Sequence, residues 1–121
     1  MNTRQVGMEK EKQACEYLKA QGMIILEQNF RNRQGEVDII GSHEGYLVFV
    51  EVKFRKNDCC GTALAAVSLP KQRQICKTAD AYRYVHHYGE NTAVRYDVLA
   101  IQGNHVEWLQ NAFSHIYTRN F

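Results

Sequence analysis

Four charged residues interrupt two strand-like runs in the stretch GEVDIIGSHEGYLVFVEVKFR, residues 35–55. They are Glu36, Asp38, Glu51 and Lys53. Runs so rich in Val, Ile and Phe are typical of buried strands, where a charge is costly unless it is paired or binds a ligand. Clustered carboxylates repel one another and need a cation, and their hard oxygens suit Mg²⁺ or Mn²⁺. The residue types therefore favour metal-dependent hydrolysis of a phosphodiester, with Lys53 to hold the attacking water or to stabilise the developing charge.

The alternation of side chains along a strand predicts how these groups meet. Glu36, Asp38 and Ile40 are expected on one face of their strand, with Val37 and Ile39 on the other. In the next strand, one face is expected to carry Leu47, Phe49, Glu51 and Lys53, and the other Val48, Val50, Val52 and Phe54. Asp38 would then lie across from, or diagonal to, Glu51 and Lys53. The alternative is a plain salt bridge between Lys53 and one of the two acids, which accounts for only two of the four charges.

The elements that must position these residues follow from periodicity and from turn residues. Hydrophobic spacing predicts helices over 4–21 and 70–88, ended by Gly22 and Gly89, with Pro70 as the first residue of the second helix. Strands are expected over 23–30, 36–41, 46–54, 93–101 and 105–110, the second and third forming an antiparallel hairpin. Residues 55–68 read as a loop with local helix near 62–67, and the last eleven residues as a tail without predicted structure.

The predicted element order is α-β-β-β-α-β-β, in one domain over residues 1–121. This order indicates a mixed β-sheet flanked by helices, in the α/β or α+β class. The first helix is expected to bury Met8, Ala14, Cys15 and Leu18, with Glu11 near the same face. The second is expected to bury Ile75, Ala79, Tyr82 and Val85.

Charge and composition limit the classes of partner that the chain could bind. The net charge is only +2, but residues 52–95 hold eight Lys and Arg against three Asp and Glu. A basic stretch beside a carboxylate cluster fits a polyanionic substrate, although on charge alone a solvated helix face is the favoured explanation. The four cysteines lack metal-ligand spacing and are expected as free thiols, and the histidines show no metal motif. A polar N-terminus and the absence of a long apolar run predict a cytoplasmic protein without a membrane partner.

Asp38, twelve further residues and then Glu51-Val52-Lys53 resemble the motif of PD-(D/E)XK nucleases. GEVDII followed by LVFVEVKFR is similar, more closely, to the YraN-like family of predicted endonucleases, which looks related to archaeal Holliday-junction resolvases. The resemblance extends over most of the chain, from Glu11 in the first helix to Arg95-Tyr96-Asp97-Val98 in the penultimate strand. It implies a restriction-endonuclease-like fold.

The resemblance also implies roles for individual residues. The implied catalytic group is Asp38, Glu51 and Lys53, with Glu36 in place of the motif's proline. The implied ligands of Mg²⁺ or Mn²⁺ are Glu11, Asp38, Glu51 and the carbonyl of Val52. Glu36 could equally be a solvent-exposed residue at the start of its strand, and Glu9 or Glu16 could be confused with Glu11.

Basic residues around this motif are candidates for contacts with DNA phosphates. They are Arg31, Arg33, Arg55, Lys56, Lys71 and Arg73, each of which could also be an ordinary surface charge. The NDCCG segment, 57–61, is a candidate substrate-contacting flap. Asp97 next to Arg95 is as readily a structural ion pair as a site residue.

These expectations combine into a metal-dependent endonuclease acting on DNA, with branched or structured DNA as the substrate that the resemblance implies. The relation to resolvases also implies a homodimer, because paired cleavage of a junction needs two sites related by a two-fold axis. The alternative is a non-catalytic nucleic-acid-binding module with the same fold. A third reading is an interaction protein in which the charged strand end is only a scaffold.

Overall fold

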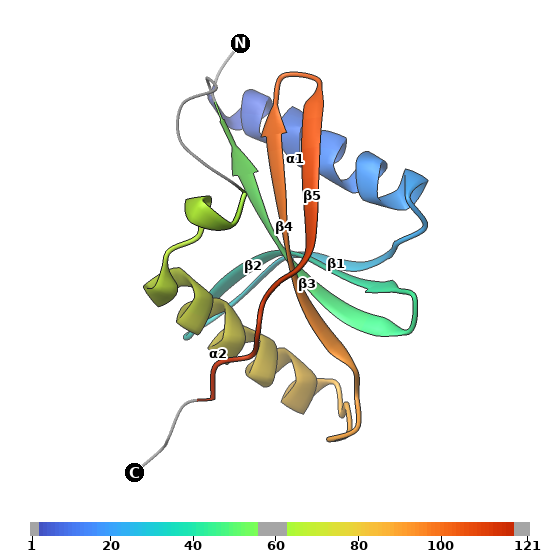
Figure 1. Cartoon of the computed structure of the whole chain (residues 1–121), viewed down its shortest axis with the longest axis vertical. Coiled ribbons are helices and arrows are strands. Elements are labelled where there is room, and N and C mark those ends of the chain that lie inside the picture. Colours follow the sequence, from blue (N-terminus) through green and yellow to red (C-terminus); the bar gives the residue numbers. More distant parts are fainter. Residues whose placement is uncertain (1–2, 56–62, 118–121) are drawn as a thin grey trace.

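The computed structural model describes residues 3–55 and 63–117, and the side chains from Gly7 onward within the first helix. Five strands form one mixed sheet between two long helices (Figure 1). In chain order the elements are α1 (Thr3–Ala20), β1 (Ile24–Asn32), β2 (Gly35–His43), β3 (Tyr46–Phe54), a short 3₁₀ helix η1 (Leu64–Ala66), α2 (Leu69–Val85), β4 (Val94–Gln102) and β5 (His105–Phe113). The predicted class and the order α-β-β-β-α-β-β are confirmed.

The sheet follows the chain, in the order β1-β2-β3-β4-β5. β1 to β3 form an antiparallel meander, β3 and β4 are parallel, and β5 returns antiparallel to β4. The parallel step needs a crossover, which η1 and α2 provide. Because the crossover starts directly after β3, the N-terminal turn of α2 lies near the end of the strand that carries the charged residues.

Each face of the sheet is covered by one helix. The core under α2 contains Ile75, Ala79 and Tyr82 of the helix with Phe49 and Tyr96 of the sheet. The core under α1 is formed by Ala14, Cys15, Leu18, Met23, Ile39, Val48, Val50, Leu99 and Ile101. The two cores explain why β3 and β4 are apolar on both faces along most of their length.

Several expected boundaries and burials were wrong in detail. Met8 and Val85 are exposed, and Val85 is the last residue of its helix. α2 ends at Val85, before Gly89, with His86 as its C-cap and His87 at a positive φ of 59°. α2 begins at Leu69, one residue before the predicted start at Pro70, and Ser68 caps it by accepting a hydrogen bond from the Lys71 N–H.

The predicted tail is partly structured. β5 continues to Phe113, and the backbone N–H of Ile116 donates to Cys76 Sγ of α2 at 3.4 Å. His115 Nδ1 lies 2.6 Å from the Tyr96 hydroxyl. Cys15 and Cys76 are free, buried thiols as expected, while Lys56 and the NDCCG segment lie outside the described residues. None of the helices in the described part of the chain is long and apolar enough to span a membrane.

Candidate active site

The candidate site lies where β2 and β3 separate. Their register runs from His43↔Tyr46 to Ile39↔Val50. One residue further along, the Asp38 side chain takes the place of a backbone acceptor: its Oδ2 accepts a hydrogen bond from the Val52 N–H at 2.8 Å. A carboxylate is thus held in the ladder between two strands, next to the chain segment that carries Glu51 and Lys53.

The expected alternation of β2 was wrong at this point. Val37 packs with Ile40 in the core under α2, although strict alternation places them on opposite faces, and Ile39 belongs to the core under α1. The strand therefore changes phase at Asp38, which lines a cavity on the α1 side together with Ile39. The phase change follows from the loss of ladder partners, which leaves the backbone free to turn.

Glu51 is the buried acid of the site, with 6% of its surface exposed. Its Oε1 lies 3.6 Å from Lys53 Nζ, and its Oε2 lies 3.9 Å from Lys71 Nζ in the first turn of α2. Burial and the neighbouring Asp38 raise the pKa of Glu51 to about 7, against the opposing effect of Lys71 and Lys53. The two lysines therefore compensate only part of the cost of a charge at this position.

Opposing effects also act on the pKa of Asp38. Burial raises its pKa, the hydrogen bond from Val52 lowers it, and the neighbouring Glu36 raises it further. The predicted meeting of Asp38, Glu51 and Lys53 is present in the structure as two acids with raised pKa values beside a lysine. A site in which two acids resist ionisation is one that a cation would stabilise.

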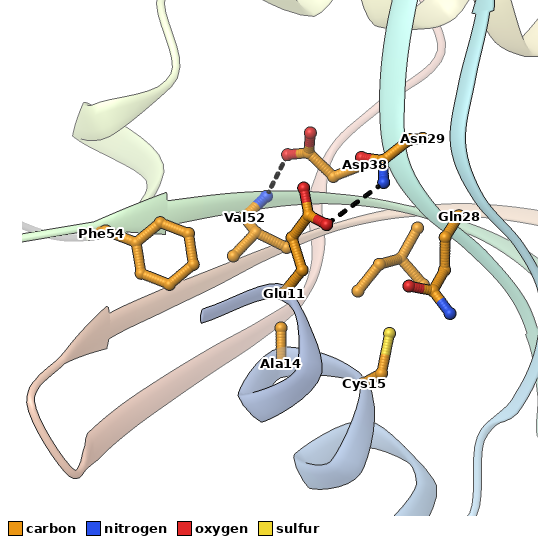
Figure 2. Close-up of a pocket in the computed structure, with 9 residues that line it drawn as sticks. Glu11, Ala14, Cys15, Gln28, Asn29, Asp38, Val52 and Phe54 are labelled. Atoms are coloured by element: carbon orange, nitrogen blue, oxygen red, sulfur yellow. Dashed lines mark hydrogen bonds between the residues drawn. The ribbon is translucent and has the colours of Figure 1, made fainter. Parts of the chain in front are cut away.

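Glu11 reaches this region from α1. It lines a cavity of about 70 Å³ together with Asn29, Asp38, Val52 and Phe54 (Figure 2). Its Oε2 accepts a hydrogen bond from Asn29 Nδ2 at 3.4 Å. Glu16, the neighbouring alternative, forms an ion pair with Lys12 instead. The structure thus brings Glu11 to the cavity that Asp38 lines.

The candidate metal ligands do not form a closed group. Within residues 3–55 and 63–117, no three His, Cys, Asp or Glu side chains are arranged to hold a metal ion. The backbone offers a further oxygen, because the N–H and C=O of one strand residue point to the same side. The Val52 carbonyl is therefore expected to point toward the same edge of β3 at which the Val52 N–H donates to Asp38. A Mg²⁺ ion needs only one or two carboxylates beside water and phosphate oxygens, so the donor set fits such an ion.

Glu36 has a separate environment. Its Oε2 lies 3.2 Å from Arg31, and its backbone carbonyl accepts from Gln74 of α2 at 3.5 Å. It is half-buried, and its charge raises the pKa of Asp38. Arg31 is thereby engaged in an ion pair, while Arg33 and Arg73 are exposed and Arg55 is half-buried.

Comparison with known proteins identifies the family of this chain. Residues 10–101 match the model of the uncharacterised protein family UPF0102. The chain belongs to this family. The match spans every candidate acid, from Glu11 to Asp97.

Relatives of this UPF0102 chain occur in distant bacteria. A UPF0102 protein of Lachnoclostridium phytofermentans is 42% identical over 113 residues, 93% of this chain and 96% of that protein. One of Vibrio vulnificus (strain YJ016) is 41% identical over 114 residues, 92% and 93% of the two chains. One of Coxiella burnetii (strain RSA 493) is 37% identical over 111 residues, 91% and 92%. The similarity therefore extends along nearly the whole of each protein.

A second polar cluster in the UPF0102 chain resolves the alternatives for Asp97. Its carboxylate, 1% exposed, forms an ion pair with Arg95 Nε at 2.9 Å and accepts from Trp108 Nε1 and from the Asn111 N–H, each at 2.9 Å. Arg95 also lies 2.9 Å from His43 Nδ1. The cluster ties the β2–β3 turn to β4 and β5 and is structural.

Sequence reasoning missed three residues that the structure places in these clusters. Asn29 lines the cavity, and His43 and Trp108 surround the Arg95–Asp97 pair. His43 and Trp108 lie far from Arg95 in the sequence, so no spacing relates them to it. For Asn29 a signal existed, since an Asn inside a strand-like run is unusual and tolerates a left-handed backbone.

Proposed function

We propose that this UPF0102 protein is a divalent-metal-dependent endonuclease of the YraN-like, PD-(D/E)XK type, which hydrolyses phosphodiester bonds of DNA. The observation that carries the proposal is the placement of Asp38 near the buried Glu51 beside Lys53, where burial raises the pKa of both acids and Asp38 raises the pKa of Glu51 further. A fold gains nothing in stability from two such acids. A site that binds a cation and a phosphate, in contrast, needs such acids as ligands of the cation.

Asp38, Glu51 and the Val52 carbonyl would hold the ion, with Glu11 as a further donor from α1. A bound Mg²⁺ or Mn²⁺ would neutralise charge on the phosphate and make a water more acidic. Lys53, whose ammonium group already lies beside Glu51, would orient the attacking water or stabilise the charge that develops on the phosphate oxygens. Hydrolysis forms a new P–O bond to water and breaks the one to the leaving sugar oxygen, which takes up a proton.

Lys71 extends this site toward the substrate. It lies on the first turn of α2, one-third exposed, with its ammonium group 3.9 Å from Glu51. If Glu51 ligates a cation, the negative charge of Glu51 is shared with that cation. Lys53 and Lys71 then become available to a phosphate. Lys71 and the exposed Arg33 and Arg73 are proposed to contact the DNA backbone, with branched DNA as the proposed substrate and a homodimer as the proposed assembly.

One observation favours the second candidate, a nucleic-acid-binding module without catalysis. Glu51 is already paired with two lysines, and the part of the chain described here has no closed group of three metal-ligating side chains. A binder of this kind would hold DNA equally well in EDTA. Its affinity would fall with rising salt.

The two candidates separate in one cleavage experiment. Labelled duplex, single strand, flap and four-way junction are incubated with Mn²⁺, Mg²⁺ or EDTA. The wild type is compared with Glu51→Gln, Lys53→Met and the matched control Lys77→Met, which removes an exposed lysine elsewhere on α2. We expect cleavage that requires metal, is lost in the first two variants and is retained in the control. Salt-sensitive binding in EDTA, without cleavage of any substrate, would establish the binding module instead.

A further inference from the structure

Asn29 has an unusual backbone conformation for a residue within a strand. Its φ is 53°, in the left-handed region, although it lies in the middle of β1. Side chains other than Gly rarely adopt this region, and Asn is among those that tolerate it best. Backbone strain of this kind persists where the surrounding structure demands it, and it concentrates at functional sites.

The position of Asn29 in the sheet places it beside Asp38. β1 and β2 are paired through Gln28↔Ile39 and Phe30↔Val37, so Asn29 lies opposite Asp38. Both residues line the cavity next to α1, and both depart from regular strand structure, one in its φ and the other in its phase. The two irregularities face each other across the ladder.

The side chain of Asn29 connects this point with α1. Its amide Nδ2 donates to Glu11 Oε2 at 3.4 Å, and Figure 2 shows the Glu11 side chain rising from the helix toward Asn29 and Asp38. Glu11 is exposed and carries a long, flexible side chain. Without a partner it would sample many rotamers, most of them directed to solvent.

We propose that Asn29 is a positioning residue of this site, whose amide holds the Glu11 carboxylate over the cavity that Asp38 lines so that α1 contributes an oxygen donor to the bound cation. The inference rests on the proposed function. In it, the left-handed backbone of Asn29 in β1 directs the side-chain amide toward α1. Residues that orient a metal ligand in this way commonly change metal affinity by tenfold or more when removed.

The chain offers a matched control. Asn111 of β5 has the same φ of 53°, but it lies at the bulge between β4 and β5, where its N–H donates to Asp97 rather than near Glu11. Replacing either Asn by Gly keeps the backbone conformation accessible and removes only the side chain. Asn29→Gly and Asn111→Gly thus carry the same change, one at the site and one away from it.

The test is titration of the full-length protein with Mn²⁺ in a calorimeter, which needs no cleavage. The wild type is compared with Asn29→Gly, Asn111→Gly, Glu11→Gln and the double variant Asn29→Gly/Glu11→Gln. We expect Asn29→Gly to weaken Mn²⁺ binding by about tenfold and Asn111→Gly to leave it unchanged. The double variant should bind as weakly as Glu11→Gln alone, because Asn29 acts only through Glu11.

Each other result overturns a distinct claim. Equal Mn²⁺ affinity of wild type and Asn29→Gly, or additive losses in the double variant, would overturn the positioning role and leave the metal site intact. A wild type that binds no Mn²⁺ would overturn both the metal-dependent function and this inference. Should Asn29→Gly fail to fold by circular dichroism, Asn29→Ala, which also lacks the amide, is measured against Asn111→Ala with the same expectations.

Discussion

The carboxylate of Asp38 accepts a hydrogen bond from the backbone N–H of Val52, with 2.8 Å between Oδ2 and N. Val52 lies between Glu51 and Lys53 in the sequence, so this bond fixes Asp38 against the segment that carries the other two charged groups. The Asp38 carboxylate thereby accepts the hydrogen bond that a backbone carbonyl accepts between two paired strands. The spacing of the site depends on this bond more than on side-chain contacts between the charged groups.

The burial of two acids predicts that the site weakens the fold. Asp38 has a raised pKa, so its ionised form is disfavoured in the folded state. Asp38→Asn keeps an oxygen that can accept from Val52 and removes the repulsion with Glu51. We expect the free energy of unfolding to increase by about 1 kcal/mol near neutral or alkaline pH, as is common when an active-site charge is removed.

Urea denaturation in EDTA measures this effect, beside a cleavage assay in which Asp38→Asn should be inactive. Glu90→Gln, at an exposed turn, serves as the control and should change neither property. A variant that is less stable than the wild type by a similar amount would show that the Asp38 charge supports the fold, and would contradict the strain ascribed to the site.

Glu51 predicts a dependence of stability on pH. Its pKa is raised from 4.5 to about 7 in the folded protein. Between these pH values the Glu51 carboxyl has lost its proton in the unfolded chain but retains it in the folded chain. The free energy of unfolding therefore falls as the pH rises through this window and is level above it. The contribution is at most about 3 kcal/mol, and Glu51→Gln should remove it.

The measurement is urea unfolding in EDTA at several pH values between about 4.5 and 8. The comparison is the difference between wild type and Glu51→Gln, because groups remote from the site titrate equally in both. If this difference does not change with pH, the Glu51 carboxyl titrates at an ordinary pKa and its burial is already compensated by Lys53 and Lys71.

Lys71 predicts an effect on DNA binding rather than on folding. Its contact with Glu51 spans 3.9 Å and the side chain is about one-third exposed, so the ion pair itself contributes little to stability. Lys71→Met should weaken binding to DNA of any sequence and reduce the slope of log K against log salt by about one. Fluorescence anisotropy over a salt series measures both, and Lys77→Met should retain the wild-type slope. Equal slopes in all three proteins would remove Lys71 from the DNA-contacting surface.

The Asp97 cluster predicts a large cost in stability without a specific role in catalysis. Asp97→Ala leaves Arg95, which is 5% exposed, as a buried charge without its carboxylate. Loss of one partner of such a pair costs about 3 kcal/mol or more. Asp80→Asn disrupts the more exposed contacts with Arg83 and His115 and should cost about 1 kcal/mol or less. Thermal or urea denaturation distinguishes the two, and an Asp97→Ala protein of wild-type stability would contradict the structural assignment.

Most of the element order could be predicted from the sequence, because hydrophobic period and turn residues act locally. The hairpin of β2 and β3, the start of α2 near Pro70, and the class of the fold all rest on such local signals. The alternating faces of β3 were also predicted correctly, since that strand is paired on both sides and keeps its pleat.

The tertiary structure alone decided the phase change in β2 and the reach of α1. At the point where β2 and β3 separate, Asp38 bonds Val52, fourteen residues away, and the packing of α1 places Glu11 rather than Glu16 at the cavity that Asp38 lines. Asn29 acquires its meaning only opposite Asp38. Residue types and spacing thus determined which chemistry the chain could carry, and the packing of distant segments determined which of those residues meet, because contact across elements is not encoded in local periodicity.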